Sequence, residues 1–130
     1  MALFDEAWMT RFAEIWNGDD ELTGALGAIG FNSTIGYGVP DEDSPRGVLV
    51  VENGKVAHAG AWNGEALNWD IRASEEQWQK WMAKPPGMMG LGTAFTTGKL
   101  KFVVGDYGAM LKDPGMAKPF IRTFHLMGQV

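Results

Sequence analysis

The two histidines, His58 and His125, have the side chains whose ordinary pKa lies nearest neutral pH, so they are the first candidates for proton transfer or metal binding. Neither has a carboxylate or a second histidine at the spacing of a metal site. His58 falls in a strand-like pattern, and His125 follows Phe124 in an apolar helical pattern. Both are therefore predicted to be surface or partly buried histidines without a catalytic or metal-binding role.

Two aspartates, Asp70 and Asp106, form the remaining pair that could support acid–base chemistry. Strand-end hydrogen bonding or a turn explains each of them more simply. The chain has no Gly-x-Ser-x-Gly motif, and Ser33, Ser44 and Ser74 fall in a strand, a loop and a helix start. We therefore predict no catalytic residue, no metal site and no cofactor.

One enzymatic alternative remains open at this stage. Two opening helices followed by strands also suit the fold of small α+β enzymes that resemble ketosteroid isomerase. In such an enzyme Asp70 would act as the general base in an apolar pocket, with a strongly raised pKa.

Composition and charge narrow the class of protein. The chain has 130 residues, no cysteine and a formal net charge of −5, which fits a single domain spanning residues 1–130 without disulfides or thiolate chemistry. The negative charge argues against a nucleic-acid partner and against an anionic membrane surface. There is no pattern of a signal peptide and no apolar run long enough to cross a bilayer. We expect a cytoplasmic protein without stable membrane insertion.

Helical periodicity marks both ends of the chain. Apolar residues at spacings of three and four predict a first helix over about 3–16, and this stripe could seal the domain or form a homodimer contact. A second short helix capped by Asp19 or Asp20 follows and ends at Gly30. A short helix is predicted over 107–111, followed by a break at Asp113-Pro114. A final helix is expected to carry Phe120, Ile121, Phe124 and Met127, with Met116 just ahead of it. The segment 86–93, in which methionines stand among glycines, is predicted to be a loop.

Strand patterns fill the middle of the sequence. Alternation predicts a strand over 31–39, and Asn53-Gly54 predicts a tight hairpin between strands 47–52 and 55–62 within an antiparallel meander. A fourth strand is expected over 66–73, before a helix that opens with a capping box at Ser74 and Gln77. In a fifth strand over 99–104, Leu100, Phe102 and Val104 are predicted to face the helices.

Several of these segments resemble the sterol carrier protein 2 family, whose SCP2 domains bind lipids. The resemblance rests on WDIRAS at 69–74 followed by a helix, on AFTTGKLKFVVGD at 94–106, on the STIGYGV strand at 33–39, and on the VVENGKV hairpin at 50–56. It covers nearly the whole chain. The C-terminus, however, lacks the Ser-Lys-Leu address of peroxisomal members.

The resemblance implies an α+β fold with a five-stranded, largely antiparallel sheet, helices packed on one face, and an apolar tunnel between the two layers. It also implies a non-enzymatic carrier for a sterol, fatty acid or acyl-CoA, alone or as an accessory to a lipid- or steroid-degrading enzyme, with a homodimer or a partner enzyme left open. Burying about fifteen methylenes is worth roughly 12 kcal/mol, against association costs of about 4 to 15 kcal/mol, so an apolar tunnel needs no charged anchor.

Methionine and aromatic side chains are the candidate walls of that tunnel, because they are large and methionine adapts its shape. The chain has six Trp, seven Phe and eight Met. The residues predicted to line the ligand site, all of them in the second half, are Trp81, Met82, Met88, Met89, Phe95, Phe102, Met110, Phe120, Phe124 and Met127.

Overall fold

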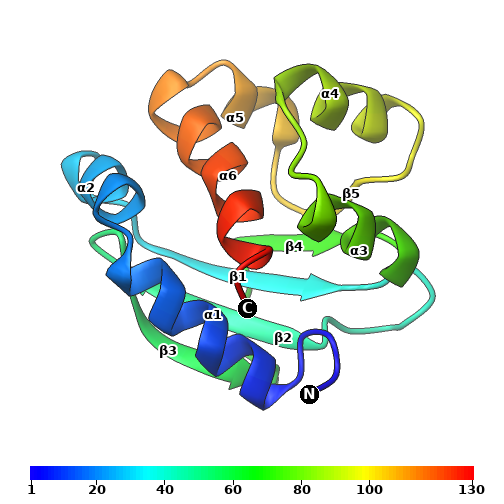
Figure 1. Ribbon diagram of the computed structural model, residues 1–130, viewed down its shortest axis with the longest axis horizontal. Coiled ribbons are helices and arrows are strands. Elements are labelled where there is room, and N and C mark those ends of the chain that lie inside the picture. The colour runs from blue at the N-terminus through cyan, green and yellow to red at the C-terminus, as the bar shows by residue number, and fades with distance from the viewer.

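The computed structural model describes all residues from 1 to 130 as one five-stranded sheet with helices packed against one of its faces (Figure 1). Two helices open the chain, α1 (Glu6–Gly18) and α2 (Asp20–Ala28). The strands β1 (Ser33–Gly38), β2 (Gly47–Glu52), β3 (Lys55–Ala61) and β4 (Trp69–Arg72) follow. After α3 (Glu75–Ala83) and α4 (Met88–Thr96) come β5 (Lys101–Val104), α5 (Tyr107–Leu111) and α6 (Pro114–Met127). The predicted α+β class, strand number and one-sided helix layer are confirmed.

The strand order is β3-β2-β1-β4-β5. Three of the four pairs are antiparallel, but β1 and β4 run parallel, with Ile35 opposite Trp69 and Tyr37 opposite Ile71. The predicted meander was therefore wrong beyond β3. Asn68 explains the change, because its backbone N–H and side-chain Oδ1 both bond to Thr34 and dock the incoming chain beside β1 instead of β3.

The hairpin between β2 and β3 follows the prediction from Asn53-Gly54. Both residues have positive φ, +49° and +85°, which lets a two-residue turn match the twist of the strands. Trp16 fixes this turn to α1, since its indole N–H donates to the carbonyl of Gly54 at 2.9 Å. The hairpin thereby positions the C-terminal end of α1 over the sheet.

Aromatic side chains form most of the core between α1 and the sheet. Phe4, Trp8, Phe12 and Trp16 are all less than 7% exposed, so the first apolar stripe seals the domain and leaves no face there for a dimer contact. Helix α1 begins at Glu6 and not near residue 3, because the Asp5 side chain accepts the N–H of Trp8 and caps the helix.

Two predictions for the second half were wrong. The segment 86–93 is not a loop: most of it belongs to α4, in which Leu91 and Ala94 share one face and are buried. The two glycines of this helix concealed its apolar spacing. Leu100, just before β5, and Phe102 within it turn inward as predicted, but Val104 is 38% exposed, because the register shifts in this strand's pairing with β4.

Candidate functional site

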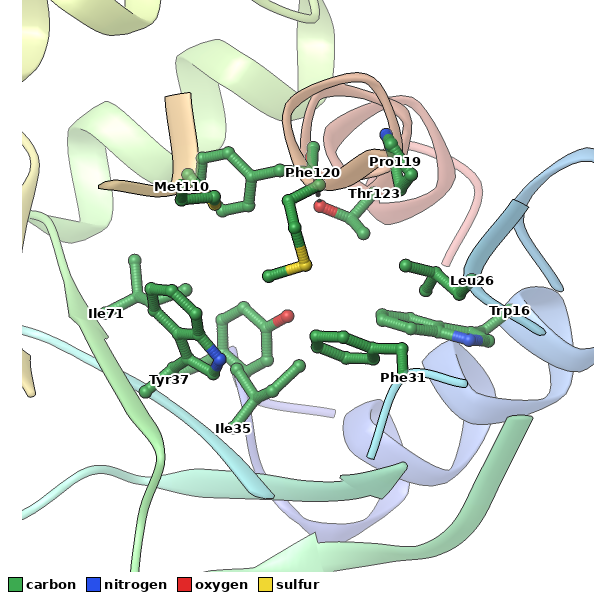
Figure 2. A pocket seen from close by; sticks show the side chains of 12 residues that line it. Trp16, Leu26, Phe31, Ile35, Tyr37, Ile71, Met110, Pro119, Phe120 and Thr123 are labelled. Carbon is green, nitrogen blue, oxygen red and sulfur yellow. Dashed lines mark hydrogen bonds between the residues drawn. The ribbon is translucent and has the colours of Figure 1, made fainter. Parts of the chain in front are cut away.

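A small apolar cavity lies between α6 and the helix-facing side of β1 and β4 (Figure 2). The strands supply side chains by alternation, Ile35 and Tyr37 from β1 and Trp69 and Ile71 from β4. No charged side chain reaches the cavity. Its complete lining is Trp16, Leu26, Phe31, Ile35, Tyr37, Trp69, Ile71, Met110, Met116, Pro119, Phe120 and Thr123.

Helix α6 supplies the opposite wall from a single stripe. Met116, Pro119, Phe120 and Thr123 stand at positions i, i+3, i+4 and i+7, which fall on one face of a helix. Asp113 starts this helix by accepting the N–H of Gly115 at 2.9 Å. The stripe therefore faces the sheet along its whole length.

The cavity volume is about 40 Å³. That is room for a few water molecules and well below the ~150 Å³ that accommodates a benzene ring. Ligand pockets for larger molecules typically enclose about 300–1,000 Å³. The apolar tunnel that the family resemblance implied is thus not present as an open channel in this structure.

Two residues with hydroxyl groups line this cavity, Tyr37 and Thr123, and only the Tyr37 hydroxyl has no hydrogen-bond partner. The residue is only 2% exposed, its hydroxyl makes no hydrogen bond within the protein, and burial raises the pKa of the phenol well above its usual value. Figure 2 shows the hydroxyl pointing into the cavity. Thr123 also lines the space, but its Oγ1 already donates to the carbonyl of Phe120 at 2.5 Å. Tyr37 therefore has an unused donor and Thr123 has only lone pairs to offer.

The ten residues predicted to line a ligand site are divided among four places. Met110 and Phe120 line the cavity. Phe102, Phe124 and Trp81 pack next to it in a chain of aromatic contacts, with ring centroids 5.9 Å apart for Phe102–Phe120, 5.2 Å for Phe120–Phe124 and 5.4 Å for Phe124–Trp81.

The other five predicted residues lie away from the cavity. Met82 and Met127 meet beside the N-terminal Leu3 in a shallow surface hollow. Met88, Met89 and Phe95 are exposed on α4, by 42%, 87% and 41%.

Sequence reasoning missed most of the cavity wall, although two patterns in the sequence mark it. The alternation that placed Ile35 and Tyr37 on one face of a strand predicts that they point toward the helices. The spacing of Met116, Phe120 and Thr123 predicts a second stripe on the last helix. The contact between these two faces is long-range, and neither pattern alone indicates it.

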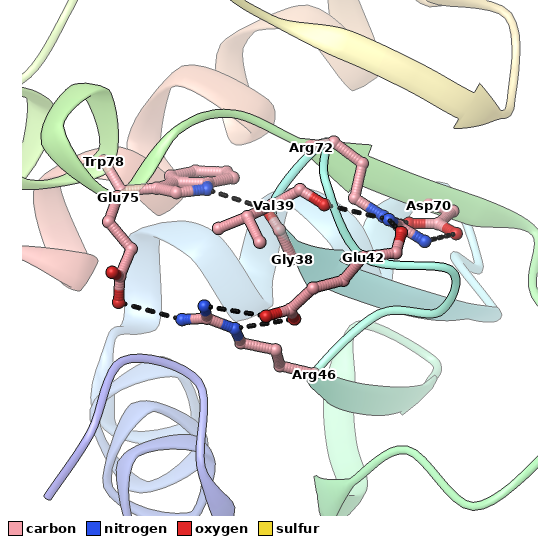
Figure 3. Close-up of polar contacts among 8 residues, drawn as sticks. All are labelled: Gly38, Val39, Glu42, Arg46, Asp70, Arg72, Glu75 and Trp78. Atoms are coloured by element: carbon pink, nitrogen blue, oxygen red, sulfur yellow. Dashed lines mark hydrogen bonds and ion pairs between the residues drawn. The ribbon is translucent and has the colours of Figure 1, made fainter.

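The two aspartates considered for acid–base chemistry, Asp70 and Asp106, make structural hydrogen bonds instead. Asp70 is buried on the face of the sheet that the helices leave free, where its carboxylate accepts two hydrogen bonds from the Arg72 guanidinium (Figure 3). Arg72 in turn donates to the carbonyls of Val39 and Glu42 and holds the β1–β2 loop. Asp106 is exposed and caps α5 through the N–H of Ala109.

The isomerase-like alternative is therefore not favoured, because Asp70 alternates away from the cavity-lining Trp69 and Ile71. His58 and His125 are both exposed. No group of three histidine or acidic side chains could hold a metal ion. No helix is both long and apolar enough to span a bilayer.

Comparisons with known proteins identify the fold. No family model and no curated sequence matches the chain. Among solved structures, the crystal structure of a sterol carrier protein 2 superposes with a TM-score of 0.77 at 20% identity, covering 99% of both chains. A conserved hypothetical protein of Thermus thermophilus, described as possibly a sterol carrier protein, gives 0.67 at 21% identity, over 98% of this chain and 90% of the other.

A third solved structure, a UbiJ-SCP2 ubiquinone synthesis protein, gives a TM-score of 0.61 at 11% identity, over 95% of this chain and 90% of its own. The architecture is an α+β domain in which helices cover one face of a five-stranded sheet. More specifically, the chain has the sterol carrier protein 2 fold over its full length.

Proposed function

We propose that this protein is a non-enzymatic carrier that binds a hydrophobic molecule, such as a sterol, fatty acid or acyl-CoA, between α6 and the sheet. The observation that carries the proposal is the apolar cavity at this position in a sterol carrier protein 2 fold. The absence of any charged group in the wall favours binding over chemistry.

A ligand needs more room than the cavity now has, and the wall formed by α5 and α6 is the part suited to supply it. Met110 and Met116 line this side, and their flexible side chains change shape at little cost. Pro119 lies within α6 and cannot donate a backbone hydrogen bond to the preceding turn, which weakens the helix at the cavity. We propose that the cavity grows past Phe120 toward Phe102 and Phe124, and that the exposed α4 side chains Met88, Met89 and Phe95 lie at its outer end.

Tyr37 gives the proposed binding site one polar group. The Tyr37 hydroxyl faces the cavity and forms no hydrogen bond in the protein, so a ligand oxygen that accepts a hydrogen bond from it would gain about 0.5–1.5 kcal/mol. The best ligand is therefore a long or polycyclic apolar body with one hydroxyl, carbonyl or carboxyl group that reaches Tyr37.

The direct test is native mass spectrometry of the protein as purified from cells, followed by titration with hexadecanoic acid and cholesterol. We expect a bound mass in the first experiment and a change in tryptophan fluorescence in the second, because Trp16 and Trp69 line the cavity. A protein that carries no ligand and whose fluorescence responds to neither molecule is not a carrier of this kind.

The polar end is tested by Tyr37→Phe, with Tyr107→Phe as the matched control. Tyr107 also has a buried hydroxyl without a hydrogen bond, but it does not line the cavity. Loss of one neutral hydrogen bond should weaken binding of 1-dodecanol about 2- to 12-fold in Tyr37→Phe. The effect should be smaller in Tyr107→Phe, because the Tyr107 ring packs beside Phe102 and Phe120 at the far side of the proposed extension. Equal effects of the two substitutions would remove the anchor role and leave carrier function untouched.

A further inference from the structure

Exposed apolar side chains are concentrated in one segment of the chain. Seven large apolar side chains are exposed in the whole protein, and five of them lie between residues 88 and 104, on α4 and β5. Met89 is the most exposed of all, at 87%. We call the exposed side of α4 the α4 surface, and its apolar members are Met88, Met89 and Phe95.

Charge around the α4 surface is opposite to that of the protein as a whole. Residues 77–105 include four lysines and no acidic residue. Two of these lysines, Lys84 and Lys99, are exposed and flank α4 in sequence, and a third, Lys101, is exposed on β5. Helix α4 itself has no charged residue. Helix α4 is thus an apolar helix with exposed lysines on both sides of it in the sequence.

The net charge of −5 conceals a strong asymmetry. Residues 1–79 have four Lys or Arg and fourteen Asp or Glu, whereas residues 80–130 have seven Lys or Arg and only two Asp. Figure 1 places α4 at the end of the molecule away from α1, which belongs to the acidic half. Charges more than about 8 Å apart are largely screened at physiological ionic strength, so a partner that meets α4 experiences mainly the lysines.

Helix α4 is also the least secured helix in the protein. Every other helix has a side-chain hydrogen bond at its N-cap, but Gly87 gives α4 none. Leu91 and Ala94 attach it to the body by burial, and Phe95 stacks on Tyr107 of α5 with ring centroids 4.4 Å apart. The side chain of Met89, which is 87% exposed, can turn toward a new environment without breaking the core.

We propose that the α4 surface docks the protein on an anionic lipid bilayer, with Met89 and its neighbours in the interface and the flanking lysines on the lipid headgroups. Apolar burial and attraction to anionic lipids are the two forces that hold interfacial helices. The acidic half would be repelled by the same lipids, which orients the molecule with α4 toward the bilayer. This docking needs no ligand in the cavity, so it can be tested independently of carrier function.

The experiment measures sedimentation of the purified protein with phosphatidylcholine vesicles and with vesicles that also contain phosphatidylglycerol. Binding should require the anionic lipid and should fall as salt is added. Lys84→Gln and Lys99→Gln should each weaken binding about fivefold, since a lysine near such a surface contributes about 1 kcal/mol. Met89→Ser should weaken binding about tenfold through loss of part of a buried methionine.

Matched controls lie elsewhere on the surface. Lys55→Gln, on β3, and Ile29→Ser, at the end of α2, remove an exposed lysine and an exposed apolar side chain outside the α4 surface and should leave binding unchanged. Equal binding to both vesicle types, or no binding to either, overturns the proposal. So does a dimer, detected by analytical ultracentrifugation, that dissociates in Met89→Ser, because a second copy would then cover this surface.

Discussion

Helices α1 and α4 are both rich in methionine and aromatic residues, yet they place these side chains in opposite environments. In α1, Met9 and Phe12 have no exposed surface, and charged residues occupy the solvent side. In α4, Met89 and Phe95 are exposed and no charged residue is present. The same residue types therefore build a core in one helix and an apolar surface in the other.

The difference follows from what each helix lies against. Helix α1 crosses β2 and β3 (Figure 1), where Gly47 lets it approach so closely that a Cβ at this position would lie 2.8 Å from the carbonyl of Phe4. Helix α4 instead meets the four-residue edge strand β5 and the short helix α5, where Phe95 contacts Phe102 and Tyr107. The apolar content of a helix thus indicates only that its side chains favour burial. Whether they are buried depends on the neighbouring elements.

The largest expected contrast is between two methionines. Met9→Ala should lower the free energy of unfolding by about 2–5 kcal/mol, because it empties a fully buried site. Met89→Ala should change it by less than about 0.5 kcal/mol. Urea unfolding followed by tryptophan fluorescence measures both. If Met89→Ala were as destabilising as Met9→Ala, α4 would be part of the core and the contrast would disappear.

The elements of the fold could be predicted from the sequence where local chemistry decides them. Asn53-Gly54 predicted the β2–β3 hairpin, Asp113-Pro114 the break between α5 and α6, and the pattern over 107–111 the bounds of α5. The parallel pairing of β4 with β1 could not be predicted in this way. It depends on Asn68 bonding to Thr34, a contact between residues far apart in the chain.

The candidate site could be predicted only in small part. Met110 and Phe120 line the cavity, but the other eight predicted residues belong to the core beside it, the hollow near the C-terminus or the α4 surface. An apolar pattern shows that a side chain is suited to burial. It does not show whether the opposing side chain touches it or leaves a gap, and a cavity is the sum of such gaps between distant elements.

The second prediction concerns Asp19, which secures α2 in a way that α4 lacks. Its carboxylate caps α2 at the N–H of Leu22 and pairs with Arg122 of α6 at 2.7 Å. Asp19→Ala removes both interactions and should destabilise the protein by about 1–2 kcal/mol. Asp19→Asn keeps a capping oxygen and should cost less.

The pH dependence of stability distinguishes the Asp19–Arg122 ion pair from the capping of α2 by Asp19. The hydrogen bond from Arg122 holds the pKa of the Asp19 carboxyl below its ordinary value, so this stabilisation is complete above the unfolded-state pKa of about 3.9. It is lost as the pH falls below that value toward the lower folded-state pKa. The stability difference between wild type and Asp19→Asn should therefore shrink below about pH 4 in urea titrations. A difference that stays constant down to about pH 2 would mean that the charge of Asp19 contributes nothing.

The smallest expected effect is a gain in stability, whereas the substitutions above lower stability, and it concerns α4 itself. Gly90→Ala should stabilise this helix by about 0.5–1 kcal/mol, because alanine loses less backbone freedom in a helix than glycine does. The new Cβ would make an ordinary 3.7 Å contact with the Cβ of Pro86. Amide hydrogen exchange measures the gain, and it should slow at Leu91 and Ala94 in α4 while α1 amides stay unchanged. Because α4 has no side-chain cap, it opens by itself and its own propensity sets its protection. Equal slowing in α1 would instead mean that the two helices unfold as one unit.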